Sequence, residues 1–347
     1  MDRRWLSAAA AAPLLLVAGA SQAETTISTA VTTPVTTATA ASGSPDDLTI
    51  SSAGSVKPAG GTAVTLNSNN KLSVAGEVTI TDANDATAIL IEGGRTGEVT
   101  LSGTVQVNES YAAEDADDDG DLDGPFASGS NRFAVRVSGA EPFHGSIVQT
   151  AGAIAVEGND SAGIYAQSAV DGAIRSAGSI TVTGDRSYGL HAAGTVGGDV
   201  VTTGGLTAQG LGAVGVAVDQ NVGGRLVLGS SVTATGYRYT TRPSDTDILD
   251  ADDLLQGGPA VRVRGSVQGG VLVDAPPADN NAEDTDEDDD GVADASESTG
   301  VVTAYGSAAA IQIGGAGDIV LGAVGTGVDA YGLVVKGSAN GIGLSPS

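Results

Sequence analysis

Three consecutive segments repeat one pattern, in which short apolar runs alternate with Gly-rich turns: SAGIYAQSAVDGAIRSAGSITVTGD (residues 161–185), SYGLHAAGTVGGDVVTTGGLTAQG (187–210) and VGVAVDQNVGGRLVLGSSVTATG (214–236). The aligned apolar residues Ile164, Leu190 and Val216 stand 26 residues apart in each step. A sequence repeat of this length is typical of a solenoid, in which each repeat stacks on the next. Three runs in about 25 residues match one coil of a right-handed parallel β-helix.

The same register extends over most of the chain. The residues equivalent to Ile164 in the first run of each coil are Val64, Ile89, Val135, Leu190, Val216, Val261, Ile311 and Leu333. The residue two places later is apolar in every coil, whereas the residue between them varies widely, for example Thr65, Arg136 and His191. An alternation with period two predicts strands that bury one face and expose the other.

The third run of each coil shows the same alternation. Its paired apolar positions are Val78/Ile80, Val105/Val107, Ile154/Val156, Ile180/Val182, Leu206/Ala208, Val232/Ala234 and Val328/Ala330. A slip of one residue would turn each pair outward, so the register is strongly specified. The sequence therefore predicts an all-β fold, a right-handed parallel β-helix (solenoid) of about nine coils that forms a rod about 40 Å long.

The N-terminal residues predict export from the cytoplasm. Residues 1–23 have the features of a secretory signal peptide: a positively charged start, an apolar run over 6–20, and small residues before Ala23. Residues 24–46 are rich in Thr, Ala and Ser, which predicts a flexible leader. The β-helix is then expected over 47–347, truncated at its C-terminal end because the chain stops just after opening a further coil.

Three acidic insertions interrupt the register, at residues 109–130, 237–258 and 274–299. They hold 24 of the 42 Asp and Glu residues, so the formal net charge of −27 is concentrated in loops. The first two insertions follow a third run and should leave from one corner, four coils or about 19 Å apart along the axis. The third insertion falls between a second and a third run and should leave from another corner.

The third insertion fits the 12-residue calcium-loop pattern, in which alternate oxygen ligands surround the ion and a Gly makes the bend. The predicted Ca²⁺ ligands are Asp286, Asp288, Asp290, the backbone carbonyl of Val292, Asp294 and Glu297. The first insertion fits only the first half of the pattern, with Asp115, Asp117, Asp119, Asp121 and Asp123. Phe126 stands where that loop needs a bidentate carboxylate. The alternative for both is a solvated acidic loop without an ion.

The sequence shows no catalytic motif, so we expect that the protein is not an enzyme. The chain has two histidines: His191 falls at an outward, exposed strand position, and His144 falls in a turn. The sequence contains neither a G-x-S-x-G elbow nor an H-E-x-x-H pair. Arg136 and Arg262 occupy equivalent outward positions, where solvated surface charge is the simplest account. The acidic surface should repel nucleic acid and anionic lipid headgroups.

A signal peptide, a Thr-rich leader and coils of the form AVRVSG…GSIVQTAGAIAVEGND make residues 24–347 resemble the passenger region of a Gram-negative autotransporter. The resemblance implies a β-helical passenger that crosses the periplasm and reaches the cell surface or the medium. In that family a C-terminal β-barrel anchors the passenger in the outer membrane, and this sequence shows no such segment.

The resemblance favours a structural stalk with an adhesin-like, surface-interaction role. Its ligand would be a glycan or another component of a cell surface, and nucleic acid is not expected as a partner. The alternative is a carbohydrate-active β-helix enzyme of the lyase or hydrolase type, with its site on the outer face or in a missing C-terminal part.

Overall fold

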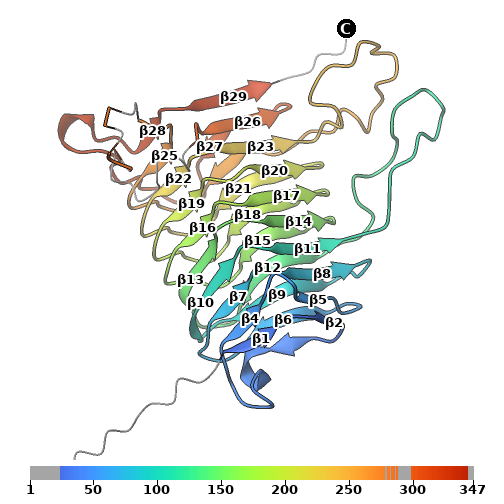
Figure 1. Cartoon of the computed structure of the whole chain (residues 1–347). Helices are drawn as coiled ribbons and strands as arrows, with labels where there is room; N and C mark the ends of the chain where they lie inside the picture. Colours follow the sequence, from blue (N-terminus) through green and yellow to red (C-terminus); the bar gives the residue numbers. More distant parts are fainter. Residues whose placement is uncertain (1–23, 278–279, 282, 286, 288–297, 343–347) are drawn as a thin grey trace, which may run out of the picture.

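The computed structural model describes residues 24–277, 280–281, 283–285, 287 and 298–342. Three parallel sheets, here called A, B and C, form the sides of one stack of coils that narrows toward its N-terminal end (Figure 1). In this part of the chain the helices are two short 3-10 turns, η1 (Thr37–Thr39) and η3 (Gly327–Asp329). None of the described helices has the length and apolar character needed to cross a membrane.

The strands fall into sheets A, B and C in turn. Sheet A holds β1 (Thr25–Ile27), β4 (Leu48–Ile50), β7 (Leu72–Val74), β10 (Thr96–Leu101), β13 (His144–Gln149), β16 (Ile174–Ser176), β19 (Val200–Thr202), β22 (Leu226–Leu228), β25 (Val271–Val273) and β28 (Leu333–Val335). Sheet B holds β2 (Ala30–Val31), β5 (Ser55–Val56), β8 (Glu77–Thr81), β11 (Thr104–Asn108), β14 (Ala153–Glu157), β17 (Ser179–Thr183), β20 (Leu206–Gln209), β23 (Ser231–Thr235), β26 (Val301–Tyr305) and β29 (Ser338–Ile342). Sheet C holds β3 (Val35–Thr36), β6 (Thr62–Leu66), β9 (Ala86–Glu92), β12 (Arg132–Ser138), β15 (Ala162–Ala166), β18 (Tyr188–Ala192), β21 (Val214–Val218), β24 (Val261–Val263) and β27 (Ile311–Ile313).

Each strand pairs in parallel with the strand three places further along the chain, as a parallel β-helix requires. Ile164 is aligned with Leu190 and Leu190 with Val216, which confirms the register predicted for the central repeats. Because backbone N–H and C=O groups are satisfied between coils, each coil depends on its neighbours for stability.

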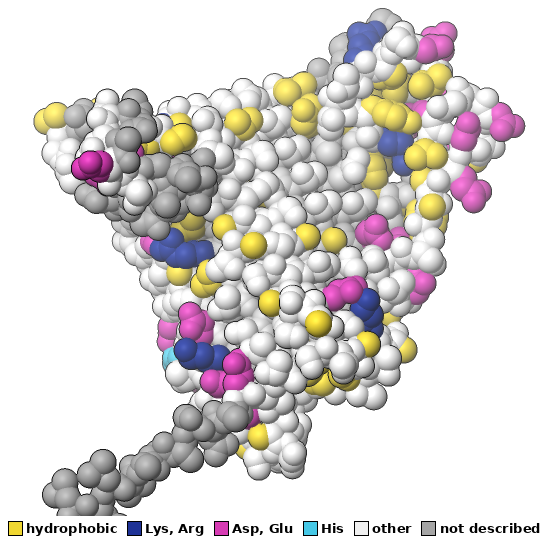
Figure 2. All heavy atoms as spheres, viewed as in Figure 1, with side chains coloured by type: hydrophobic (Ala, Val, Ile, Leu, Met, Phe, Trp, Pro, Cys, Tyr) yellow, Lys and Arg dark blue, Asp and Glu magenta, His cyan; other side chains and the backbone are white. Residues whose placement is uncertain are grey.

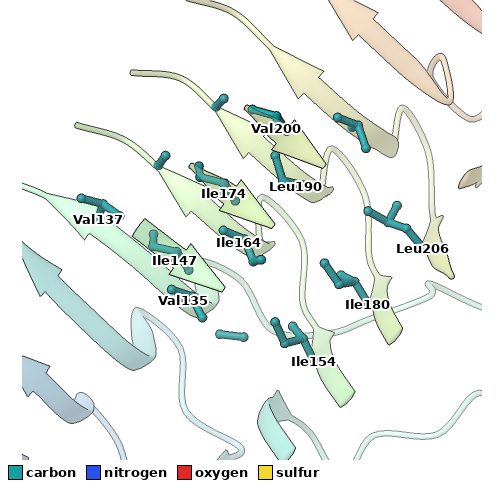
Figure 3. Packing of buried hydrophobic residues seen from close by; sticks show 14 of the residues in the cluster. Val135, Val137, Ile147, Ile154, Ile164, Ile174, Ile180, Leu190, Val200 and Leu206 are labelled. Carbon is teal, nitrogen blue, oxygen red and sulfur yellow. The ribbon is translucent and has the colours of Figure 1, made fainter. Parts of the chain in front are cut away.

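The core lies in the space that the three sheets enclose. Figure 3 shows Ile164 and Leu190 from sheet C, Ile174 from sheet A and Ile180 from sheet B pointing into it. These side chains are fully buried. Burying one Leu or Ile side chain contributes about 1.5–3 kcal/mol, so the repeated inward positions supply the main stabilisation.

A small residue precedes each marker of sheet C and also faces inward. A Cβ built at Gly163, Gly189 or Gly215 would meet the core side chains of sheet B at 2.4–2.8 Å, and Ala takes this position in other coils. Two successive inward residues mean that the chain bends at this point. The residue before the bend therefore faces outward again, which places Phe133, Ala162 and Tyr188 in one outward column.

The prediction of a flexible leader over residues 24–46 is wrong. Strands β1, β2 and β3 pair with β4, β5 and β6 and complete a first coil, with Ile27, Val31 and Val35 packed against the core. Thr-rich composition with few large residues predicts a flexible chain when taken alone. A coil whose backbone groups form hydrogen bonds with the next coil needs only one apolar residue per strand.

The prediction for the last coil is also wrong. Leu333 is aligned with Val271 in sheet A, and is not a sheet C residue. Val328 lies in η3 with 91 % of its surface exposed, and the sheet B pair in this part of the chain is Val302 and Ala304. Short apolar runs are alike in all three sheets, so spacing alone could not separate them after a long insertion.

Candidate functional site

The outer face of sheet C carries an open groove of about 690 Å³. Its lining comes from five successive sheet C coils, from Asp85 beside β9 to Gly212 before β21. Ala162 forms part of its floor, and two Arg, two Asp, one Asn and one Gln are among the lining residues. The groove is therefore polar and close to neutral in formal charge, unlike the acidic insertions.

Four rings stacked along the solenoid axis form one wall of the groove. The ring centroids of Phe133 and Tyr165 are 5.3 Å apart, those of Tyr165 and His191 5.1 Å, and those of His191 and Tyr188 4.1 Å. Parallel pairing places one outward residue about every 4.8 Å, which is close to the spacing at which rings stack. The period-two alternation predicted the outward position of His191 but not those of Phe133 and Tyr188, because these two residues lie before the bend.

Two guanidinium groups pack against the stack. The guanidinium carbon of Arg136 lies 4.9 Å from the Phe133 centroid and 6.0 Å from the Tyr165 centroid, and that of Arg262 lies 5.3 Å from the Tyr188 centroid. A cation over an aromatic face is attracted by the ring quadrupole. The two arginines therefore pack on rings and do not extend freely into water, which differs from the solvated charges expected from sequence.

Asp219 bonds to both His191 in the stack and Arg262. Its Oδ2 lies 2.8 Å from His191 Nε2 and 2.9 Å from Arg262 Nη2. Burial alone would raise the pKa of Asp219, but the hydrogen bonds from His191 and Arg262 outweigh burial and lower it to about 2. Only 12 % of the His191 side chain is exposed, so the predicted exposed position is wrong. The reason is that the imidazole lies between two rings, Tyr165 from the preceding coil and Tyr188 from its own strand.

The groove's other polar groups differ in how well they are paired. Arg186 makes two hydrogen bonds to Asp160, at 2.8 and 2.7 Å. Arg136 donates two hydrogen bonds to the neutral amide oxygen of Gln167, at 3.0 and 2.6 Å. Among the described residues, Arg136 has no carboxylate partner and the Tyr165 hydroxyl has no hydrogen-bond partner.

The first two acidic insertions meet each other outside the coils. Both leave from the edge between sheets B and C, as predicted, and the first rises along the stack toward the second (Figure 1). Gly124 N donates to Asp252 Oδ2 at 2.8 Å, and Arg238 Nη2 donates to Gly124 O at 2.6 Å. Arg238 also lies over the Phe126 ring at 5.0 Å. Figure 2 shows carboxylates on these projecting loops at the right of the view.

Two carboxyl groups face each other at this junction. Asp121 from the first insertion and Asp253 from the second have 4 % and 1 % of their surfaces exposed. Interaction with Asp253 and burial raise the pKa of Asp121 to about 6, because two adjacent carboxylates cannot both ionise without cost. Asp253 also accepts a hydrogen bond from Arg238 Nε at 3.1 Å.

Acidification is therefore expected to tighten the junction. Folded Asp121 keeps its proton up to about pH 6, whereas an unfolded aspartate loses it at about pH 3.9. The folded state binds more protons at Asp121 between these values, so the contribution of Asp121 to stability is greatest below about pH 4 and is lost as pH rises through 6. Proteolysis within residues 114–126 should slow when the pH is lowered from about 7.5 to about 5, relative to Asp121→Asn. The same pH response in both proteins would contradict this prediction.

The predicted calcium ligands have different positions. In the first insertion, carboxylate oxygens of Asp115, Asp117 and Asp123 lie within 4.8 Å of one another, a grouping that could hold a metal ion. Asp119 accepts a hydrogen bond from the Asp121 backbone, and the Asp121 carboxyl faces Asp253. The third-insertion ligands lie outside the described residues: Asp286, Asp288, Asp290, Val292, Asp294 and Glu297. Calcium binding at both insertions stays a prediction.

No family model matches the chain, and neither a curated protein nor a solved structure matches it. The fold and the groove define its class: a parallel β-helix that carries a polar, aromatic-walled groove on sheet C and two insertions joined above the sheet B–C edge.

Proposed function

We propose that the chain is a secreted or surface-displayed β-helical passenger of the autotransporter kind, with an adhesin-like role. The observation that carries this proposal is the open groove on the outer face of an uninterrupted stack of coils. Every sheet C strand between the first and last is paired on both sides, so the face presents side chains on a rigid support. A structural stalk that displays a binding surface makes use of this arrangement.

The charge distribution supports a surface-interaction role. Carboxylates are concentrated in the insertions, whereas the groove combines rings, amides and both signs of charge. An acidic periphery limits nonspecific binding to anionic lipid and nucleic acid through repulsion. A ligand that enters the groove meets hydrogen-bond donors fixed by the coils, and rigid donors lose little conformational entropy on binding.

Export can be tested by expressing the full chain in a Gram-negative bacterium. We expect the protein outside the cytoplasm, with Glu24 as its new N-terminus after signal cleavage. A matched control is Leu15→Arg, which places a charge in the apolar run and should retain the uncleaved chain in the cytoplasm. Equal cytoplasmic retention of both proteins would reject the proposal.

The alternative function, a carbohydrate-active enzyme, can be examined on the same exported protein. A lyase or hydrolase would shorten a polysaccharide, whereas a binding passenger should leave its chain length unchanged. Chain length after incubation, measured by size-exclusion chromatography, distinguishes the two functions. We expect no shortening.

A further inference from the structure

We infer that the groove on sheet C binds an acidic saccharide, a sugar chain that bears carboxylates, with Arg136 as the group that recognises the carboxylate. This inference rests on the proposed surface-interaction role and specifies its ligand class. It follows from three features of the groove: an uncompensated guanidinium, a wall of ring edges, and an elongated open shape.

Arg136 is the groove's cation without a carboxylate partner among the described residues. A guanidinium has five N–H donors, and the hydrogen bonds of Arg136 to Gln167 use only Nε and Nη2. Arg186, by contrast, is neutralised by Asp160 through two bonds. A planar carboxylate matches the remaining donors of Arg136, and such charge-assisted bonds are about twice as strong as neutral ones. Within a chain of net charge −27, this guanidinium is a local site for an anion.

The aromatic wall favours a hydroxylated ligand over a flat aromatic one. The four rings cover much of one another's faces because their neighbouring centroids are only 4.1–5.3 Å apart. Arg262 packs on Tyr188, and Arg136 packs beside Phe133 and Tyr165. What the wall offers is therefore ring edges and the hydroxyl of Tyr165, which has no hydrogen-bond partner in the described part of the chain. Sugar hydroxyls can accept from and donate to such a group.

The shape of the groove suits a chain that lies along the solenoid axis. Lining residues come from five successive sheet C coils, which corresponds to about 19 Å at about 4.8 Å per coil. A peptide usually binds a sheet by adding a strand to a free edge. The strands beneath the groove are paired on both sides, so a peptide finds no such edge here. A saccharide needs only side-chain contacts, and these are what the face provides.

The test is calorimetric titration of the purified full chain with a hexamer of β-glucuronic acid. We expect binding that weakens with salt and is at least about tenfold weaker for the fully methyl-esterified hexamer, a difference of about 1.4 kcal/mol. Arg136→Gln should weaken binding by a similar factor. Arg175→Gln, on sheet A, removes an exposed pair with Asp199 and should leave binding unchanged.

A second variant tests the place of binding. Tyr165→Phe removes the hydroxyl from this side of the groove and keeps the ring in the stack, so the fold should accept it. We expect weaker binding with an unchanged circular dichroism spectrum. Equal binding of the ester, equal binding of Arg136→Gln, or no binding would overturn the inference. Tighter binding of a poly-glutamate peptide would overturn the saccharide assignment. Because purified protein is used, none of these outcomes depends on export.

Discussion

Leu190→Asp is expected to lower the free energy of unfolding by at least about 4 kcal/mol. Leu190 lies in β18 and is fully buried between Ile164 and Val216 of the adjacent coils. Truncation of a buried Leu costs about 2–5 kcal/mol, and the carboxylate adds the cost of an unpaired charge in the core. Urea unfolding followed by circular dichroism measures the change.

The matched control is Thr181→Asp, in β17 of the preceding repeat. Thr181 faces outward and is exposed between the buried residues Ile180 and Val182. Introducing the Asp carboxylate at Thr181 should change the free energy of unfolding by no more than about 0.5 kcal/mol. Hydrogen exchange should also show increased opening of the coils next to Leu190→Asp and none next to Thr181→Asp. Equal destabilisation by both variants would mean that the inward and outward faces are wrongly assigned.

Arg132→Met is expected to cost about 3–5 kcal/mol, because it leaves a buried carboxylate without its cation. Arg132 Nη1 lies 2.7 Å from Glu109 Oε2, and only 3 % of each side chain is exposed. Burial alone would raise the pKa of Glu109, but hydrogen bonds from Ser128, Arg132 and Gly129 lower it. Arg132 also donates to the carbonyls of Ala83 and Glu157, so it joins three coils.

Arg186→Met provides the comparison for that variant. Its ion pair with Asp160 has similar length, 2.7 Å, but 56 % and 47 % of the two side chains are exposed. Exposed pairs contribute about 0–1 kcal/mol, so the expected loss is small. Adding Glu109→Gln to Arg132→Met should recover part of the stability, since the buried charge is then removed. A loss below about 1 kcal/mol for Arg132→Met would show that Glu109 is not held as a buried ion.

The central coils could be predicted from sequence because inward and outward residues alternate there without interruption. Ile164, Leu190 and Val216 share one sheet in the structure, as the 26-residue spacing required. The predictions are wrong where that alternation is short or interrupted. The Thr-rich first coil has few apolar residues, and Leu333 follows an insertion that hides which sheet comes next.

The candidate site was less predictable, because it depends on contacts that spacing does not encode. Tyr188 enters the aromatic stack only because the small residue Gly189 bends the chain and turns the preceding side chain outward. Arg238 and Gly124 are 114 residues apart in sequence and belong to loops whose register is not fixed by the repeat. The interruptions of the register did identify both loops as insertions from one edge, and their mutual contact could be found only in three dimensions.

The joined insertions also bear on how the molecule would yield to a pulling force. A solenoid ordinarily peels from an end, one coil at a time, because each coil holds only its neighbours. The Arg238–Gly124 contact connects loops that leave after β11 and β23, and so spans the coils between them. A force applied along the axis must break the contact between the two insertions before the coils between them can separate. The middle of the rod should therefore rupture as a single block, at a higher force than its two ends.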